Sequence, residues 1–265
     1  MSSQRVDLLY DALHAFEARR HGGHAYPVHK VLAADRLGRD DIYDWILERI
    51  EPGPVRHALD AGCGVGYGSF RLAQRLGCRV TGISVSEREV ANASAAARSL
   101  GLSERIEFRR ASFDDLPPAT YDLIVAVESL KHSSDLAASL TSMLGSLTPN
   151  GQLVIVDDCY DGKGRAAIER QLMADWELAR VYTERDFLGP LGAARCHVVD
   201  LSDGVRHKGK WAIALGLLGV TLSRPFVDSS GDRALRAFRG GLRLEQLYAC
   251  GAMTYKAIFA KARGA

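Results

Sequence analysis

The sequence has little of what would place it in several large classes of protein. Its five cysteines are odd in number, widely spaced and without a C-x-x-C pair, which argues against a disulfide framework or a zinc site. Basic and acidic residues nearly balance, at 34 and 32, so the concentrated positive charge of a nucleic-acid-binding protein is missing. The longest apolar run, Trp211 to Thr221, is about half of the ~20 residues that a bilayer-spanning helix needs. We therefore expect neither a nucleic-acid nor a membrane partner.

The first residues, Met1 to Asp7, lack the apolar segment of a secretory signal. We therefore expect a cytoplasmic protein whose cysteines are reduced. The rest of the composition, 47% hydrophobic and 25% charged, is that of a globular protein. At 265 residues, such a chain can bury a complete core within one domain.

The order of apolar segments predicts an α/β fold. From about residue 55 onward, β-type runs at 57–60, 79–83, 105–108, 121–127 and 152–157 mostly alternate with helical stretches. This alternation is typical of a doubly wound, mostly parallel sheet with helices on both faces. Strand candidates at 195–201 and 254–261 bring the expected sheet to seven strands.

We interpret the chain as a single domain, 1–265, with four parts. Residues 1–54 form an N-terminal helical cap, 55–202 the ligand-binding α/β core, 203–250 a lid between the last two strands, and 251–265 the last strand. A lid placed there would cover the carboxyl ends of the strands, where open α/β sheets bind their ligands.

The most informative segment is the glycine-rich stretch Ala58-Leu-Asp-Ala-Gly-Cys-Gly-Val-Gly-Tyr-Gly68. It follows a predicted strand and opens a helix, so backbone N–H groups would point at a bound ligand. The spacing is G-x-G-x-G, which disfavours the G-x-G-x-x-G fingerprint of nicotinamide dinucleotide enzymes. A phosphate-binding P-loop is excluded because no Gly-Lys-Ser/Thr follows.

This segment resembles motif I of class I S-adenosylmethionine-dependent methyltransferases, which have a Rossmann-like fold. Further matches follow in order, from about residue 55 to 160, with a looser echo at 233–261. They are Val80-Thr-Gly-Ile-Ser-Val-Ser86, Ala111-Ser-Phe-Asp-Asp-Leu-Pro117, Tyr121-Asp-Leu-Ile-Val-Ala-Val-Glu-Ser-Leu130 and Leu147-Thr-Pro-Asn-Gly-Gln-Leu-Val-Ile-Val-Asp157. The second-strand match is similar to the branch that contains sterol, tocopherol and natural-product sugar methyltransferases.

The resemblance implies S-adenosyl-L-methionine as the cofactor and assigns residues to it. Asp60 would order the glycine loop or accept a hydrogen bond from the cofactor ammonium. Glu128 would lie where cofactor and acceptor meet, or be a solvated loop charge. The other implied contacts are Gly62, Gly64 and Gly66 with the methionyl part, Ser84 and Glu89 with the ribose, and Ser112 and Phe113 with the adenine. Ser84 and Ser112 replace acidic residues that are common in the family, so Glu89 and Asp114 are candidates for the missing contacts.

Two residues are catalytic candidates. His132 matches the second histidine of a His-His pair in natural-product relatives, and a histidine with a near-neutral pKa can remove a proton from the acceptor. The alternative interpretation is that His132 lies at the start of a helix and faces solvent. Asp158 matches a carboxylate that orients or shares this proton transfer, with Asp157 as the alternative because a one-residue shift reverses the side-chain direction.

The basic segment His21-Gly-Gly-His-Ala-Tyr-Pro-Val-His-Lys30 is either a solvated loop or a cover for the site. As a cover, it would present Tyr26 and His29 to an anionic acceptor. We expect no metal, because its histidines lack carboxylate or cysteine ligands in a set pattern. We expect Arg233, Arg236, Arg239 and Arg243 to form a solvated helix face, and Trp211 to Thr221 to be buried or to bind a hydrophobic acceptor.

These features predict an enzyme that transfers a methyl group from S-adenosylmethionine to a carbon, oxygen or nitrogen of a small molecule in secondary metabolism. One alternative is a protein of the same fold that uses the bound cofactor without methyl transfer, as a cyclase would. Another is a non-catalytic partner that only binds the cofactor. The sequence is compatible with a homodimer but does not determine the oligomeric state.

Overall fold

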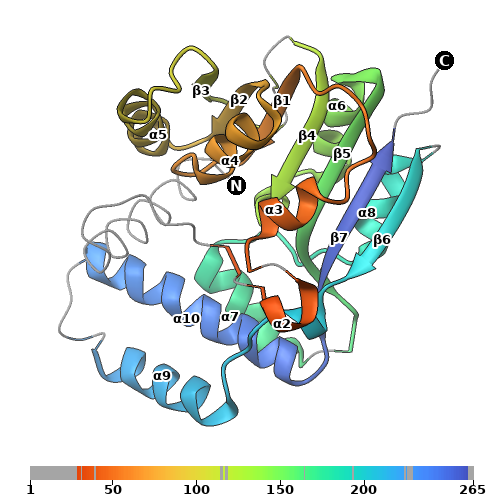
Figure 1. Cartoon of the computed structure of the whole chain (residues 1–265). Coiled ribbons are helices and arrows are strands. Elements are labelled where there is room, and N and C mark those ends of the chain that lie inside the picture. Colours follow the sequence, from red (N-terminus) through yellow and green to blue (C-terminus); the bar gives the residue numbers. More distant parts are fainter. Residues whose placement is uncertain are drawn as a thin grey trace.

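A single seven-stranded sheet organises the chain (Figure 1). The computed structural model describes residues 29–261 except 31, 39, 114–115, 117–118, 164, 193, 224 and 226–228. The strand order is β3-β2-β1-β4-β5-β7-β6, and β7 is antiparallel to both of its neighbours. The strands are β1 (His57–Ala61), β2 (Arg79–Ser84), β3 (Ile106–Arg110), β4 (Tyr121–Val127), β5 (Leu147–Tyr160), β6 (Arg195–Asp200) and β7 (Met253–Lys261). The predicted fold class, a doubly wound and mostly parallel α/β sheet, is confirmed.

Helices cover both faces of the sheet, and each face has its own apolar core. One core joins the strands to α3 (Ile42–Leu47), α4 (Tyr67–Leu76) and α5 (Glu87–Ser99). The other joins them to α6 (Leu136–Gly145) and α8 (Glu184–Leu191). The central strands are largely apolar because both faces are buried, as β4 illustrates with Leu123, Ile124 and Val125 fully buried.

A third group of helices lies at the ends of the strands. It contains α7 (Ala166–Trp176), α9 (Lys210–Ser223) and α10 (Ser229–Ala249), and Figure 1 shows these helices below the ends of β4 and β5. Both α9 and α10 lie between β6 and β7 in the chain, where the sequence predicted an insertion. Short elements complete the fold: α2 (Ala34–Leu37) and two 3-10 turns, η1 (Leu130–His132) and η2 (Ser202–Gly204).

Several details differ from the sequence-based expectation. Strand β5 extends from Leu147 to Tyr160 instead of 152–157, because its pairing with the antiparallel β7 continues to Tyr160. Helix α8 was not predicted; it begins at Thr183 with a reciprocal capping box to Asp186. The division of the chain into cap, core and lid remains an interpretation, and residues 1–28 of the expected helical cap lie outside the described residues.

The structure corrects, in part, two expectations for residues 203–250. The arginines of α10 do not form a purely solvated face, because Arg239 forms an ion pair with the buried Asp175 of α7, and Arg236 with Glu177. The apolar stretch 211–221 is only half buried: Ile213 and Val220 are covered, whereas Trp211 and Leu215 are exposed. None of the described helices is long and apolar enough to cross a membrane.

Candidate functional site

The glycine loop runs from the end of β1 into α4. The backbone N–H groups of Gly62 and Cys63 both donate to the carbonyl of Ile83 on β2, at 3.0 and 2.9 Å. Gly62, Gly64 and Gly66 have φ values of +90°, +51° and +91°, which L-residues with a side chain rarely adopt. The loop is therefore held against the sheet in a conformation that requires glycine.

The three glycines have different surroundings. A Cβ atom at Gly62 would lie 2.3 Å from the Cβ of Ser129, and one at Gly66 would lie 2.8 Å from the ring of Phe108. Among the described residues, no heavy atom other than those of its chain neighbours would lie within 4 Å of a Cβ atom at Gly64. Gly62 and Gly66 thus allow close packing, whereas Gly64 borders space that no described residue fills, which leaves the loop backbone accessible to a ligand.

Asp60 lies in β1, two residues before Gly62, and forms hydrogen bonds to the helices that flank the glycine loop. Its carboxylate is fully buried and accepts hydrogen bonds from the Ser69 hydroxyl at 2.7 Å and from the Tyr43 hydroxyl at 3.3 Å. Burial raises the pKa of Asp60 to about 6, although these hydrogen bonds oppose the shift. Both carboxylate oxygens are engaged within the protein, which favours the loop-ordering role over a contact with the cofactor ammonium.

Ser84 and Glu89 lie together at the carboxyl end of β2. The Ser84 hydroxyl donates to the Glu89 carboxylate and accepts from the backbone N–H of Ser86 at 3.1 Å. Ser86 is the N-cap of α5, and its side chain accepts from the N–H of Glu89. The two predicted ribose-side residues are therefore neighbours on the edge that carries the glycine loop, and their ribose contacts stay a prediction.

The predicted adenine-side residues follow β3. The N–H of Ala111 donates to the carbonyl of Ser84 at 3.0 Å, so Ser112 and Phe113 begin next to the ribose-side pair. The ring of Phe113 extends to the glycine loop, since its Cζ lies 3.6 Å from the Cβ position of Gly62. Asp114, the alternative partner for adenine, lies outside the described residues.

Glu128 connects this region to the rest of the site. It follows β4 with φ = +50°, a conformation that non-glycine residues rarely adopt and that occurs often at functional sites. Its carboxylate accepts from the backbone N–H of Lys30 at 2.7 Å and from the Tyr255 hydroxyl at 2.9 Å. Burial opposes ionisation, but the charges of Lys30 and Lys131 lower the pKa of Glu128. The side chain is therefore an ionised, bonded group and not a solvated loop charge.

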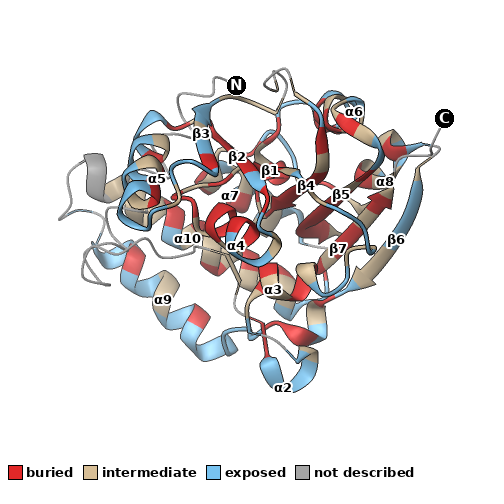
Figure 2. Ribbon diagram, turned by 45° about the horizontal axis from the view of Figure 1, so that its top comes forward, coloured by how far each residue is buried: buried red, intermediate tan, exposed pale blue. Residues whose placement is uncertain are grey.

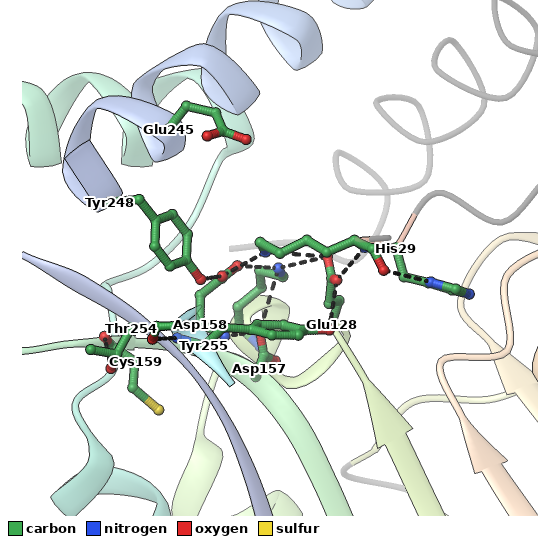
Figure 3. Close-up of polar contacts among 12 residues, drawn as sticks. His29, Glu128, Asp157, Asp158, Cys159, Glu245, Tyr248, Thr254 and Tyr255 are labelled. Atoms are coloured by element: carbon green, nitrogen blue, oxygen red, sulfur yellow. Dashed lines mark hydrogen bonds and ion pairs between the residues drawn. The ribbon is translucent and has the colours of Figure 1, made fainter. Parts of the chain in front are cut away.

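Glu128 and four other charged side chains form what we term the carboxylate–lysine cluster: Lys30, Glu128, Lys131, Asp157 and Asp158. Figure 3 labels its three carboxylates, which lie close together. Lys30 Nζ lies 2.6 Å from Asp158 Oδ1, and Lys131 Nζ lies 2.7 Å from Asp158 Oδ2. Burial alone would raise the pKa of Asp158, but the two lysines hold it well below its usual range. Asp158 is thus an ionised carboxylate with both oxygens occupied.

Asp157 has a different task from Asp158. Its two oxygens accept from the backbone N–H groups of Lys131 and Asp158, at 3.1 and 2.9 Å. Burial raises the pKa of Asp157 against the opposing effect of the Lys131 charge. Asp157 thus fixes the backbone of η1, while Asp158 holds the side chain of Lys131.

Two tyrosines from the last 20 residues complete the cluster. Tyr248 of α10 donates its hydroxyl to Asp158, and Tyr255 of β7 donates to Glu128 (Figure 3). Burial and the nearby carboxylates raise the pKa of both phenols well above the ordinary value, so they remain protonated donors. Lys30 Nζ lies 4.7 Å from the ring centre of Tyr255, a distance at which a cation is attracted to the ring face.

His132 lies on η1 next to the cluster. Burial, followed by the charge of Lys131, lowers its pKa to about 3. The imidazole is therefore neutral at pH 7 and a much weaker base than the near-neutral histidine that the sequence suggested. Its catalytic role stays a prediction.

The N-terminal candidates can be placed only in part, since Tyr26 lies outside the described residues. His29 Nδ1 lies 3.3 Å from the carbonyl of Lys30, and its ring lies 5.8 Å from that of Tyr43 and 5.6 Å from that of Tyr67. His29 thus lies near α4, while the adjacent Lys30 enters the cluster. Among the described residues, no group of three or more His, Cys, Asp or Glu side chains is arranged to hold a metal ion.

Sequence reasoning missed five residues of this site: Lys30, Ser129, Lys131, Tyr248 and Tyr255. The Ser129 hydroxyl donates to the carbonyl of Ala61 at 2.7 Å and fixes the end of β4 to the glycine loop. One available signal was that the chain has seven lysines against 27 arginines. Two of these rare lysines, Lys30 and Lys131, contact one carboxylate.

The comparisons with known proteins agree with this geometry. Residues 55–206 match the family model described as a methyltransferase domain. "O-methyltransferase resE" of Aspergillus sclerotiorum is 31% identical over 132 residues, which cover 49% of this chain and 48% of the relative. "Methyltransferase GfsG" of Streptomyces halstedii is 36% identical over 114 residues, covering 42% and 41%. The chain thus spans about half the length of the curated relatives that it matches.

Two solved structures match nearly the whole fold. The [4+2]-cyclase SpnF has 25% identity and a TM-score of 0.76, with 100% of this chain and 97% of that chain covered. A geranyl diphosphate methyltransferase in complex with GPP and sinefungin has 20% identity and a TM-score of 0.73, with 98% of each chain covered.

The strand order, with an antiparallel β7 between β5 and β6, and the glycine loop after β1 define a Rossmann-like methyltransferase fold. The family match covers more than half of the sequence. This chain belongs to the methyltransferase domain family.

Proposed function

We propose that this protein is an S-adenosylmethionine-dependent methyltransferase that acts on a small molecule. The observation that carries the proposal is the loop Gly62–Gly66, which lies at the carboxyl edge of β1 within the 55–206 match to a methyltransferase domain. Neighbouring structures of this fold were solved with S-adenosylmethionine or with sinefungin.

The residues present fit this cofactor. The open side of Gly64 leaves the loop backbone accessible, Ser84 and Glu89 provide a hydroxyl and a carboxylate, and Phe113 provides an aromatic surface next to Gly62. When bound, S-adenosylmethionine supplies an electrophilic methyl group on a sulfonium centre. The protein then has to hold the acceptor atom in line with that group and exclude water.

The charges of the cluster constrain the acceptor. Two ammonium groups face three carboxylates in a region that is almost entirely buried, so the cluster offers no net positive charge to an anion. We infer an uncharged acceptor, unlike the geranyl diphosphate named for the neighbouring structure. The basic segment at 21–28, which suggested an anionic acceptor, lies outside the described residues.

The names of the curated relatives favour oxygen over carbon as the methylated atom, since several are called O-methyltransferases. We therefore propose a hydroxyl group of a natural product as the acceptor and keep a carbon acceptor as the alternative. Asp158 already accepts from two lysines, and His132 has a pKa of about 3, so neither is a strong base at neutral pH. An acceptor hydroxyl that is itself acidic suits such a site better than an aliphatic alcohol.

Calorimetric titration with S-adenosylhomocysteine tests the cofactor assignment. We expect binding in the micromolar range and no binding of reduced nicotinamide dinucleotides. Failure to bind S-adenosylhomocysteine would remove the basis of the proposal. A second titration with geranyl diphosphate and with geraniol tests the charge of the acceptor, and preferential binding of the diphosphate would contradict an uncharged acceptor.

A second candidate function is a cyclisation that leaves the cofactor unchanged. The match to the cyclase SpnF over 100% of this chain favours it. The two reactions differ in one product, because methyl transfer releases one S-adenosylhomocysteine per turnover and cyclisation releases none. Product formation without S-adenosylhomocysteine would decide for the second candidate.

A further inference from the structure

Helix α9 has an apolar face that no described residue covers. Trp211, Leu215, Leu218 and Leu222 are 84%, 66%, 55% and 63% exposed. Their spacing of four, three and four residues places them on one side of the helix. Of the six large hydrophobic residues that are exposed in the described chain, four lie on this face. Figure 2 shows α9 as mostly exposed at the periphery of the molecule.

The opposite side of α9 is packed and fixes the orientation of the exposed one. Ile213 and Val220 are buried, and a Cβ atom at Gly216 would lie 2.9 Å from the Leu242 side chain of α10. In Figure 1, α9 lies on the side of α10 that faces away from the sheet. The apolar face therefore points outward from the molecule and not toward the carboxylate–lysine cluster.

The charged residues in the chain segment that contains α9 are all basic. No Asp or Glu occurs between Asp203 and Asp228, whereas Arg206, Lys208, Lys210 and Arg224 lie in this interval. Lys208 and Lys210 are exposed beside Trp211 at the start of the helix. Glu245 of α10 accepts from the His207 ring and from the backbone N–H of Lys208, so this carboxylate lies beside the start of α9. The segment 204–227 thus carries four basic and no acidic residues, although the whole chain has a net charge of only +2.

We propose that the outer face of α9 docks onto an anionic lipid surface. A helix with Trp and Leu on one side and flanking lysines has the composition of elements that lie in the interfacial plane of a bilayer. At 14 residues, α9 is too short to span one. Its lysines would approach anionic headgroups while Trp211 and the leucines enter the boundary with the acyl chains.

A second copy of the chain is a poorer occupant. A stable dimer buries about 800 Å² on each partner, whereas one row of four side chains provides roughly a few hundred Å². The proposal departs from the sequence-based expectation of no membrane partner. It does not depend on methyl transfer, because no residue of the proposed cofactor or acceptor site takes part.

Vesicle flotation of the full chain tests the proposal. We expect the protein to float with vesicles of equal parts phosphatidylglycerol and phosphatidylcholine, and at least tenfold less with pure phosphatidylcholine. The double variant Leu215→Ser/Leu218→Ser should bind at least tenfold more weakly. The matched control Leu100→Ser, which alters another exposed leucine, should bind like the parent chain.

Trp211 provides a second readout. Trp45 is buried and Trp176 is half-buried, so a blue shift of the emission on adding anionic vesicles should disappear in Trp211→Phe. Absence of flotation, or undiminished flotation of the double leucine variant, would overturn the proposal. Equal binding to both vesicle types would overturn the anionic surface. A dimer in light scattering that the double variant abolishes, with no flotation, would assign the face to a second copy instead.

Discussion

Lys131 Nζ lies 2.7 Å from Asp158 Oδ2, and both side chains are buried at the carboxyl edge of the sheet. The sequence suggested that Asp158 works together with His132, the residue that follows Lys131 in the chain. In the structure, Asp158 is instead bound by the lysine that precedes this histidine, and also by Lys30 and Tyr248. The motif Lys131-His132 alone therefore does not identify His132 as the base. Lys131 contacts the Asp158 carboxylate, and its charge helps to lower the pKa of His132.

Asp158→Asn should destabilise the protein by about 3–5 kcal/mol, because removing one partner leaves buried ammonium groups uncompensated. Urea unfolding at pH 7 measures this change. The control Glu107→Gln removes one partner of the exposed pair with Arg109 and should cost less than about 1 kcal/mol. Equal effects of the two variants would show that the buried cluster does not hold the site together.

The pH dependence of stability should reveal the neutral state of His132. A folded-state pKa of about 3, against 6.5 in the unfolded chain, means that the unfolded chain binds more protons between these values. The contribution of His132 to stability is thus complete above pH 6.5 and is lost as the pH falls toward 3. In urea unfolding at pH 7.0, 6.0 and 5.0, His132→Gln should lose stability less steeply than the parent chain, by at most about 1.4 kcal/mol per pH unit. Parallel pH profiles would contradict the depressed pKa.

Gly62→Ala and Gly64→Ala should separate folding from cofactor binding. A Cβ atom at Gly62 collides with Ser129, so Gly62→Ala should lower the unfolding free energy by several kcal/mol, with partial recovery in Gly62→Ala/Ser129→Gly. Gly64→Ala meets no neighbour in the described part of the chain and should cost only about 1–2 kcal/mol, from its positive φ. We nevertheless expect it to weaken S-adenosylhomocysteine binding at least tenfold in calorimetry. Unchanged affinity would mean that the open side of Gly64 does not face the cofactor.

Adjacent glycines in α10 offer a matched test of how this helix packs. A Cβ atom at Gly240 would lie 2.3 Å from the Trp176 indole of α7, whereas at Gly241 the nearest atom is 3.9 Å away. Gly240→Ala should therefore destabilise by about 1–3 kcal/mol through overpacking. Gly241→Ala should be neutral or stabilising by up to about 1 kcal/mol, since alanine favours the helix. Thermal unfolding of the two variants compares them directly, and the reverse order would show that α10 does not pack against Trp176 at Gly240.

The sheet and the glycine loop could be predicted because their signals are local. Apolar runs buried on both faces, such as 121–127, identify central strands, and the glycines at 62, 64 and 66 mark a turn that only glycine can adopt. The ordered motifs that resemble methyltransferases support the same prediction, a mostly parallel sheet of seven strands, and the structure has such a sheet. The proximity of Ser84 to Glu89 follows from the same local geometry, a strand end and the first turn of the next helix.

The carboxylate–lysine cluster could not be predicted, because its members are distant in sequence. Lys30 is 98 residues from Glu128, and Tyr248 is 90 residues from Asp158. No periodicity connects such positions. The low pKa of His132 also depends on burial and on a neighbouring charge, neither of which a motif records. For the same reason, the exposed side of α9 could not be distinguished from its packed side in an all-apolar run.

The position of β7 has a consequence for biosynthesis. The last strand of the chain pairs with β5 on one side and β6 on the other, and it carries the tyrosine that donates to Glu128. Until residue 261 has left the ribosome, a nascent chain has no β7 to join these two strands, and Glu128 lacks one of its donors. The order of synthesis thus completes the carboxylate–lysine cluster only after the glycine loop, whose strands and helix are all encoded before residue 130.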